Sequence, residues 1–224
     1  SLAREERAVT FNGEEVSRGQ KKRSLPSTSD ASRKVRRGIG FPLLRKKTKE
    51  VKDFNHLDTF VKKMFTTMYE ERGIGLAANQ VGFNYNLMVI DISHLEEYQT
   101  LEPMVMINTE ILKEDGEIEI EEGCLSIPGY RGKILRSVTI KFGALDHSSK
   151  RIRIDAEGLL AQAIEHEVDH LNGILYTDHL RKHEDFYLIE EDHIEPENSD
   201  TNSHYTKSDS SIIVPRNSDE IIFQ

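Results

Sequence analysis

The chain is organised around one apolar segment, Gln162-Ala163-Ile164-Glu165-His166-Glu167-Val168-Asp169-His170-Leu171. In a helix, His166 and His170 lie one turn apart on the same face, because side chains at i and i+4 are neighbours there. Two imidazoles in that position can bind one metal ion, and Glu167 can handle the protons of a metal-bound water. A core helix whose histidines only satisfy local hydrogen bonds is the plainer interpretation. We favour a metal site and expect the helix to run from Ala156 to Leu171.

Cys124 is the only cysteine, so an internal disulfide is excluded and a reducing compartment is the natural expectation. A lone thiol is usually an inert buried residue. In a chain that already offers two metal-type histidines, however, the Cys124 thiolate is the obvious third ligand. A Cys-His-His set leaves a fourth position open to water, which is typical of a catalytic site.

The composition is that of a polar, soluble protein. The chain has 224 residues, of which 37% are hydrophobic and 31% charged, and it is long enough to bury a substantial core in one domain. No apolar run approaches the ~20 residues of a membrane span. The net charge of -9 argues against a protein that mainly binds nucleic acid. We therefore expect neither a membrane partner nor a sequence-specific nucleic-acid partner.

Both ends of the chain differ from its middle. Residues 1–37 hold ten Lys or Arg and five acidic residues. We predict that residues 1–34 are a disordered or leader extension; an organellar transit peptide is the alternative, although such peptides are poor in acids. Residues 192–224 are rich in Ser, Asn, Asp and Glu and are predicted to be a polar disordered tail. A catalytic domain is predicted over residues 35–191.

The middle of the chain predicts an α+β fold. An apolar stripe from Leu57 to Glu71 indicates a helix, and a short helix is expected to reach about Glu190. Pro128 and Gly129 are expected to end a strand. Other strand patterns cover residues 87–92, 105–108, 118–121, 138–142 and 151–154, too close together for the crossover helices of a parallel sheet. The prediction is antiparallel strands packed around a central metal-binding helix.

A carbonyl substrate at such a site needs donors directed at its developing oxyanion. Gln80 and the backbone N–H of Leu125 are the natural pair. The metal would lower the pKa of its water, the resulting hydroxide would attack the carbonyl, and Glu167 would act as general acid/base. Spacing and chemistry thus predict a metal-dependent amide or ester hydrolase.

Three segments resemble the signatures of the peptide deformylases. Gly73-Ile74-Gly75-Leu76-Ala77-Ala78-Asn79-Gln80 resembles the first, Glu122-Gly123-Cys124-Leu125-Ser126 the second and His166 to Leu171 the third. Their order and spacing also match, and the similarity runs from about Val35 to His183. The resemblance implies an enzyme that removes the formyl group from the N-formylmethionine of nascent polypeptides and releases formate.

The resemblance also implies a role for each site residue. Glu167 would be the general acid/base, Gln80 and the Leu125 amide would hold the formyl oxygen, and the metal ligands would be Cys124, His166 and His170. Gly75 would hydrogen-bond the substrate backbone. The methionine pocket would be lined by Ile74, Ile120, Leu159 and Ala163.

The sequence leaves more than one interpretation open at five further positions. Glu122 and Arg136 stand where the family has an ion pair, although a surface position suits Arg136 equally well. Arg131 would face later residues of the substrate or solvent. Glu165 replaces the family's usual Gln, so we expect it either to raise the basicity of His166 or to face solvent. Gln162 lies where an apolar pocket residue is common.

The resemblance implies ferrous iron as the metal, with nickel, cobalt or zinc able to substitute, whereas thiolate and imidazole ligands alone suit several metals. The implied partners are N-formylmethionyl nascent peptides, which the enzyme would bind close to the ribosome. The implied location is the cytoplasm, or an organelle if the N-terminal extension is a transit peptide.

Two alternatives come from other classes of protein. A thermolysin-like zinc metallopeptidase would use His166, His170 and a downstream Glu190 as ligands, but it leaves the two upstream segments unexplained. A metzincin-like peptidase fails, because Tyr176 stands in place of the third His. A non-catalytic binding module with a structural metal would need a fourth protein ligand, and none is evident.

Overall fold

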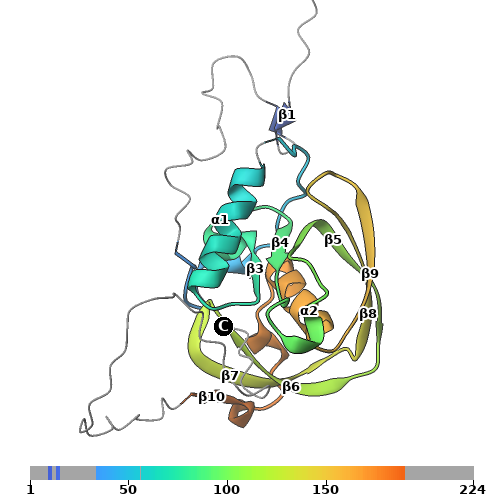
Figure 1. Ribbon diagram of the computed structural model, residues 1–224. Coiled ribbons are helices and arrows are strands. Elements are labelled where there is room, and N and C mark those ends of the chain that lie inside the picture. Colours follow the sequence, from blue (N-terminus) through green and yellow to red (C-terminus); the bar gives the residue numbers. More distant parts are fainter. Residues whose placement is uncertain (1–9, 12–13, 16–33, 56, 190–224) are drawn as a thin grey trace, which may run out of the picture.

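The computed structural model describes residues 10–11, 14–15, 34–55 and 57–189 (Figure 1). Within the N-terminal extension, β1 (Thr10–Phe11) pairs antiparallel with β2 (Glu14–Glu15). The rest of the predicted extension up to residue 33, the whole predicted tail at 192–224 and Glu190 lie outside the described residues. The domain boundaries therefore stay predictions.

Two antiparallel sheets form the body of the molecule. The larger sheet has the strand order β3 (Gly75–Ala77), β4 (Leu87–Ile90), β5 (Met104–Asp115), β8 (Thr139–Leu145) and β9 (Arg151–Glu157). The smaller has the order β10 (Phe186–Leu188), β7 (Ile127–Arg136) and β6 (Ile118–Cys124). Every pairing between these strands is antiparallel. The predicted α+β class with antiparallel sheets is confirmed.

Two α-helices cover opposite faces of the larger sheet. Helix α1 (Leu57–Glu70) lies on the outside, and α2 (Gly158–Asn172) lies within the curve of the two sheets (Figure 1). Strand β4 is buried on both faces: Met88 and Ile90 belong to the cluster around α2, whereas Leu87 and Val89 belong to the cluster around α1. This explains its unbroken apolar sequence, since a strand covered on both sides does not alternate.

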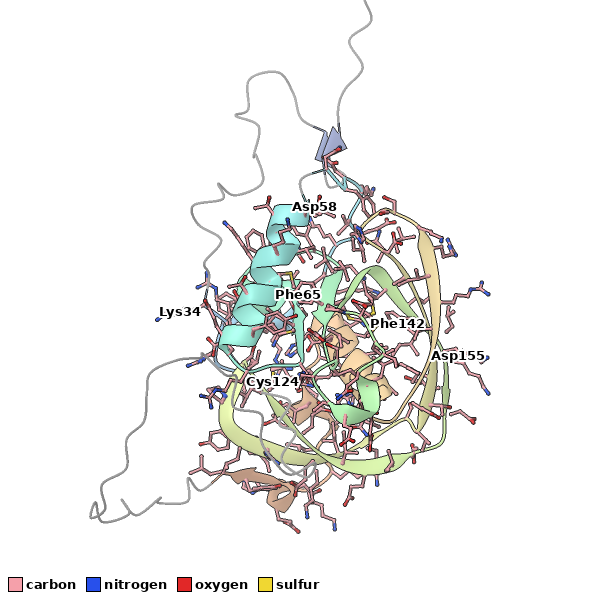
Figure 2. The ribbon with its side chains drawn as sticks, in the orientation of Figure 1. Lys34, Asp58, Phe65, Cys124, Phe142 and Asp155 are labelled. Carbon is pink, nitrogen blue, oxygen red and sulfur yellow. The ribbon has the colours of Figure 1, made fainter. Side chains whose placement is uncertain are left out.

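The side chains follow the same division between inside and outside. Phe142 of β8 is fully buried in the cluster around α2, whereas the Asp155 side chain on β9 is 79% exposed (Figure 2). A glycine lies at each end of helix α2. Gly158 and Gly173 adopt the left-handed conformation at φ +56° and +78°, which glycine tolerates best. Ala156, predicted to start this helix, instead belongs to β9.

Two further sequence predictions were wrong. Pro128 and Gly129 do not end a strand but lie inside β7, where the β6–β7 register shifts between Gly123 and Cys124. At such an irregularity the missing N–H of proline costs no ladder hydrogen bond. The predicted helix up to Glu190 is replaced by the 3-10 turns η5 (Tyr176–His179) and η6 (His183–Asp185) and by β10.

Tertiary contacts explain the second difference. Strand β10 pairs with the edge of β7, and the Phe186 ring stacks on the Tyr130 ring with centroids 4.9 Å apart. The remaining short 3-10 elements are η2 (Pro42–Arg45), η3 (Ala78–Val81) and η4 (Glu96–Tyr98). Within the described part of the chain, no helix combines the length and apolarity needed to span a membrane.

Candidate metal centre

Three buried donors from two elements meet beside α2. His166 and His170 are one turn apart on the helix, and Cys124 is the last residue of β6. Their ligand atoms all lie within 4.8 Å of one another, and none of the three residues is more than 4% exposed. Cys124 Sγ lies 3.1 Å from His170 Nε2. One thiol and two imidazoles at these distances suit a single metal ion.

The two histidines differ in their surroundings. His166 Nδ1 donates a hydrogen bond to the Glu122 carboxylate, which sets the ring orientation, so that Nε2 is the nitrogen that would bind a metal. Burial opposes protonation of His166, but the Glu122 charge outweighs it and raises the pKa of His166. Burial and the neighbouring His166 lower the pKa of His170, so His170 is in the neutral form that ligates metals.

Glu122 also forms the predicted ion pair with Arg136. Arg136 Nε donates to Glu122 Oε2 at 2.9 Å and Nη2 donates to Oε1 at 2.8 Å. The side chains are 0% and 4% exposed, so the surface alternative for Arg136 is wrong. Burial alone would raise the pKa of Glu122, but His166 and Arg136 together lower it to about 2.

Glu167 lies on α2 next to the first histidine and packs against Gly75 of β3. It is 3% exposed, and its Oε2 atom has no hydrogen-bond partner among the described residues. Burial raises the pKa of Glu167 to about 7. A carboxyl group that titrates near neutral pH is suited to take up and release a proton.

The Gln80 side chain is held in one orientation. Its Oε1 accepts a hydrogen bond from the Ala77 N–H at 2.8 Å, and its Nε2 donates to Ser126 Oγ at 3.3 Å. Nε2 also lies 3.8 Å from Cys124 Sγ. The donor end of Gln80 is therefore directed at Cys124, one of the three candidate ligands. Leu125 is the next residue in the chain after Cys124.

The apolar residues predicted to line a pocket gather around α2. Ile74 and Ala163 are buried, and Ile120 and Leu159 are half-buried against the same cluster. Gln162 of α2 is half-buried as well. Arg131 of β7 has its Nη1 3.6 Å from Glu121 Oε2, with 16% of its side chain exposed, so it is neither unpaired nor fully solvent-facing.

Glu165 meets neither expectation. It is 6% exposed, and its carboxylate accepts hydrogen bonds from Ser137 N–H at 3.0 Å and Ser137 Oγ at 2.9 Å. Adjacent residues of a helix do not share a face, so Glu165 points to the corner between β7 and β8 instead of toward the ring of His166. Burial raises the pKa of Glu165.

Three residues around the site had no predicted role. Ser126 is fully buried and contacts Gln80, and its backbone N–H donates to Cys124 Sγ at 3.4 Å. Asp169 accepts hydrogen bonds from Arg136 and His179. Ser126 and Asp169 lie inside the motifs already singled out, which was a usable signal. No sequence signal pointed to His179, because only the fold brings it near Asp169.

A buried Cys-His-His set with an adjacent carboxyl that titrates near pH 7 and a directed amide donor defines a metal-dependent hydrolase. The family model for polypeptide deformylase matches residues 37–186. The chain belongs to this family.

Relatives and solved structures agree with this assignment. A peptide deformylase of Dehalococcoides mccartyi is 43% identical over 157 residues, which cover 70% of this chain and 91% of the relative. The crystal structure of a peptide deformylase from Legionella pneumophila is similar with a TM-score of 0.62 and 43% identity, covering 66% of this chain and 85% of that one. The crystal structure of a peptide deformylase from Synechococcus elongatus in complex with actinonin is similar with a TM-score of 0.64 and 37% identity. This similarity covers 68% of this chain and 83% of that one.

The chain is accordingly an enzyme that removes the N-formyl group from nascent polypeptides in a metal-dependent reaction. Cys124, His166 and His170 form a candidate site for that metal.

Proposed function

We propose that Cys124, His166 and His170 hold one divalent metal ion and that Glu167 transfers the protons of deformylation. The observation that carries the proposal is the meeting of three buried ligand atoms within 4.8 Å beside a carboxyl with a pKa of about 7. The donors fit the metal chemically, since thiolate and imidazole together suit first-row divalent ions. We propose ferrous iron as the ion in the cell, with nickel, cobalt or zinc as substitutes.

Cys124, His166 and His170 would hold the ion, which would supply Lewis acidity toward the water and the formyl carbonyl. Glu167 then serves as the base that takes a proton from the attacking water. It later returns that proton to the amine nitrogen as the C–N bond breaks, so that formate and a free N-terminal amine are released. Its burial supports this role, because a carboxylate in water would titrate too low to return the proton at neutral pH.

Gln80 Nε2 and the Leu125 backbone N–H are proposed to stabilise the oxygen of the formyl group as negative charge develops on it. The orientation of Gln80 supports this role, because its oxygen is already occupied by the Ala77 N–H. Donors held in place before the reaction need no reorganisation during it.

The substrate methionine is proposed to bind against Ile74, Ile120, Leu159 and Ala163, which pack around α2. Gly75, at the edge of the larger sheet, would hydrogen-bond the substrate backbone. Arg131 would face later substrate residues. Because the substrates are nascent chains, we propose that the enzyme works near ribosomes in the cytoplasm, or in an organelle if the N-terminal extension is a transit peptide.

The test is anaerobic reconstitution with Fe²⁺, followed by measurement of bound iron and of formate released from a short N-formylmethionyl peptide. We expect one ion per chain and turnover. Glu167→Ala should retain the ion, since it is not a ligand, and lose at least about 100-fold in turnover. Glu167→Ala that binds no iron, or that turns over normally, would contradict the division between ligands and base.

A further inference from the structure

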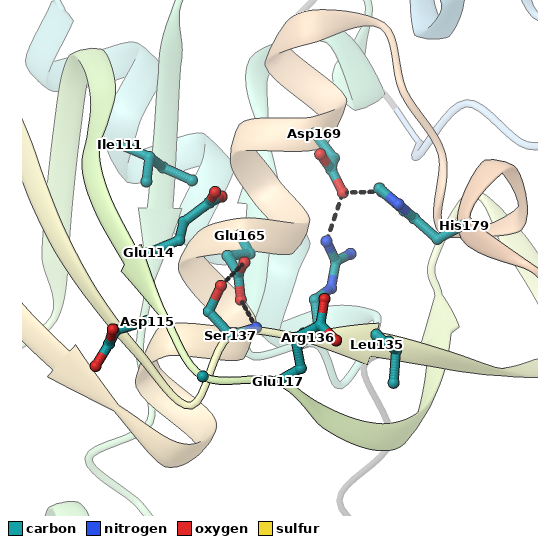
Figure 3. A pocket seen from close by; sticks show the side chains of 11 residues that line it. Ile111, Glu114, Asp115, Glu117, Leu135, Arg136, Ser137, Glu165, Asp169 and His179 are labelled. Atoms are coloured by element: carbon teal, nitrogen blue, oxygen red, sulfur yellow. Dashed lines mark hydrogen bonds and ion pairs between the residues drawn. The ribbon is translucent and has the colours of Figure 1, made fainter.

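A cavity of about 310 Å³ lies beside α2, with walls from β5, β7, α2 and η5 (Figure 3). Three of its lining residues, Arg136, Asp169 and His179, form a hydrogen-bonded row that Figure 3 marks with dashed lines. His179 lies at the exposed end of this row, with 36% of its side chain accessible.

The row continues without a break to a proposed metal ligand. His179 Nε2 donates to Asp169 Oδ2 at 2.8 Å, and Arg136 Nη1 donates to the same oxygen at 2.7 Å. The other two nitrogens of Arg136 donate to Glu122, which accepts from His166 Nδ1. Exposure falls from 36% at the His179 side chain to 16% at Asp169, 4% at Arg136 and 0% at Glu122. The row therefore leads from the cavity into the core.

His179 is itself held in place by the rest of η5. Tyr176, at the start of this turn, is 1% exposed and donates through its hydroxyl to the Tyr130 backbone oxygen at 3.3 Å. The Asp178 carboxylate accepts from the Leu175 N–H at 2.9 Å and from Arg45 at 2.5 Å. With Tyr176 and Asp178 anchored, the His179 donor faces Asp169 in a defined position.

We propose that His179 is a positioning residue of the metal centre, which fixes Asp169 and thereby, through Arg136 and Glu122, orients the His166 ring. Asp169 Oδ2 is shared between two donors. Without His179, the Asp169 carboxylate keeps only the hydrogen bond from Arg136 Nη1. The carboxylate then rotates toward the cavity and displaces Arg136 Nη1. A bidentate Arg–carboxylate pair is sensitive to such rotation, and the partner of a ligating histidine sets the orientation of its ring. The proposal rests on the ligand set proposed above.

The test compares the full chain with three variants loaded with Co²⁺, whose visible absorption reports ligand geometry. His179→Phe keeps the ring but removes the donor, and His179→Gln restores an N–H at a similar reach. His183→Ala is the matched control, because His183 is exposed on η6. The readouts are the Co²⁺ dissociation constant from chelator competition, the absorption spectrum, the melting temperature, and kcat and KM for deformylation.

We expect His179→Phe to weaken Co²⁺ binding about three- to tenfold, less than the 10- to 100-fold typical of a ligand's direct partner. Its spectrum should shift and its kcat should fall more than its KM changes. His179→Gln should recover the wild-type values, and His183→Ala should match wild type. Wild-type affinity and spectrum in His179→Phe, a lowered melting temperature alone, or failure of Gln to restore would overturn the proposal. Failure of the wild-type chain to bind Co²⁺ would instead refute the ligand set.

Discussion

Gly75 lies so close to Glu167 that no side chain fits between them. A Cβ atom on Gly75 would stand 2.5 Å from Glu167 Oε1 and 3.0 Å from its Cγ. Real Cβ atoms do not approach oxygen that closely, so the carboxylate occupies the space that the missing side chain leaves open. The position of Glu167, the proposed general base in the third family segment, thus explains the glycine in the first.

Gly75→Ala should displace the Glu167 carboxylate and lower turnover at least about tenfold, because misplacing a reacting group by an ångström is costly. Metal content should be unchanged, since the ligands are elsewhere. Gly40→Ala is the control, with nothing within 4 Å of its Cβ position. Measured kcat and bound metal check both variants; a fully active Gly75→Ala enzyme would show that Glu167 tolerates the shift.

Arg136→Met should leave the Glu122 charge buried with one partner fewer and destabilise the fold by about 3–5 kcal/mol. Urea denaturation of the metal-free protein measures the loss apart from metal binding. Lys141→Ala provides the comparison, because its ion pair with Asp155 has side chains 60% and 79% exposed, and such pairs contribute at most about 1 kcal/mol. Equal effects in the two variants would contradict this difference.

Cys124→Ser should remove or exchange the metal, because a serine hydroxyl is a poor substitute for a thiolate ligand. Metal analysis after dialysis, together with formate release, checks this. In a zinc metallopeptidase of the thermolysin type, Cys124 would not be a ligand and the variant would keep its ion. Retention of full metal content would therefore show that Cys124 is not a ligand.

Glu165→Gln should preserve the fold and the metal. The amide oxygen can accept from the Ser137 N–H and the amide nitrogen can donate to Ser137 Oγ, so both hydrogen bonds of the carboxylate have a replacement. A buried charge is removed at the same time, which favours equal or greater stability at neutral pH. Denaturation of the two proteins at pH 7 tests this, and a clearly less stable Gln variant would mean that the charge itself is needed.

Tyr69→Phe should make the stability of the protein less dependent on pH. Tyr69 donates a hydrogen bond to Asp91 Oδ2 at 2.5 Å. Burial opposes ionisation of Asp91, but the hydrogen bonds from Tyr69 and Ser93 outweigh it and lower the pKa of Asp91 below its ordinary 3.8. A carboxyl with a lowered folded-state pKa adds stability above its unfolded pKa and loses it as the pH falls through the folded value.

The variant should therefore lose about 1 kcal/mol at pH 7, a modest value because Tyr69 is 50% exposed. The difference from wild type should shrink as the pH falls through and below 3.8. Urea denaturation at a series of pH values measures it. A difference that stays constant over that range would show that the hydroxyl acts through something other than the charge of Asp91.

Local patterns in the sequence determined the proposed ligand set and the class of fold. The i, i+4 spacing of His166 and His170 depends only on helix geometry, and the lone Cys124 had no competing partner. The alternating and apolar runs were enough to exclude a parallel sheet, because they left no room for crossover helices. The Glu122–Arg136 pair came from resemblance alone.

Only the tertiary structure decided what depends on contacts between distant segments. Pro128 continues a strand because residues 128–130 of β7 have no partner in β6 where the register shifts, so the missing N–H breaks no pairing with β6. Strand β10 exists because the edge of β7 was available to pair. Glu165 is buried because its helix position faces Ser137, 28 residues earlier. His179 contacts Asp169 from the turn η5, which no hydrophobic periodicity in the sequence predicts. Sequence period reports local geometry, whereas these placements are set by which surfaces the folded chain brings together.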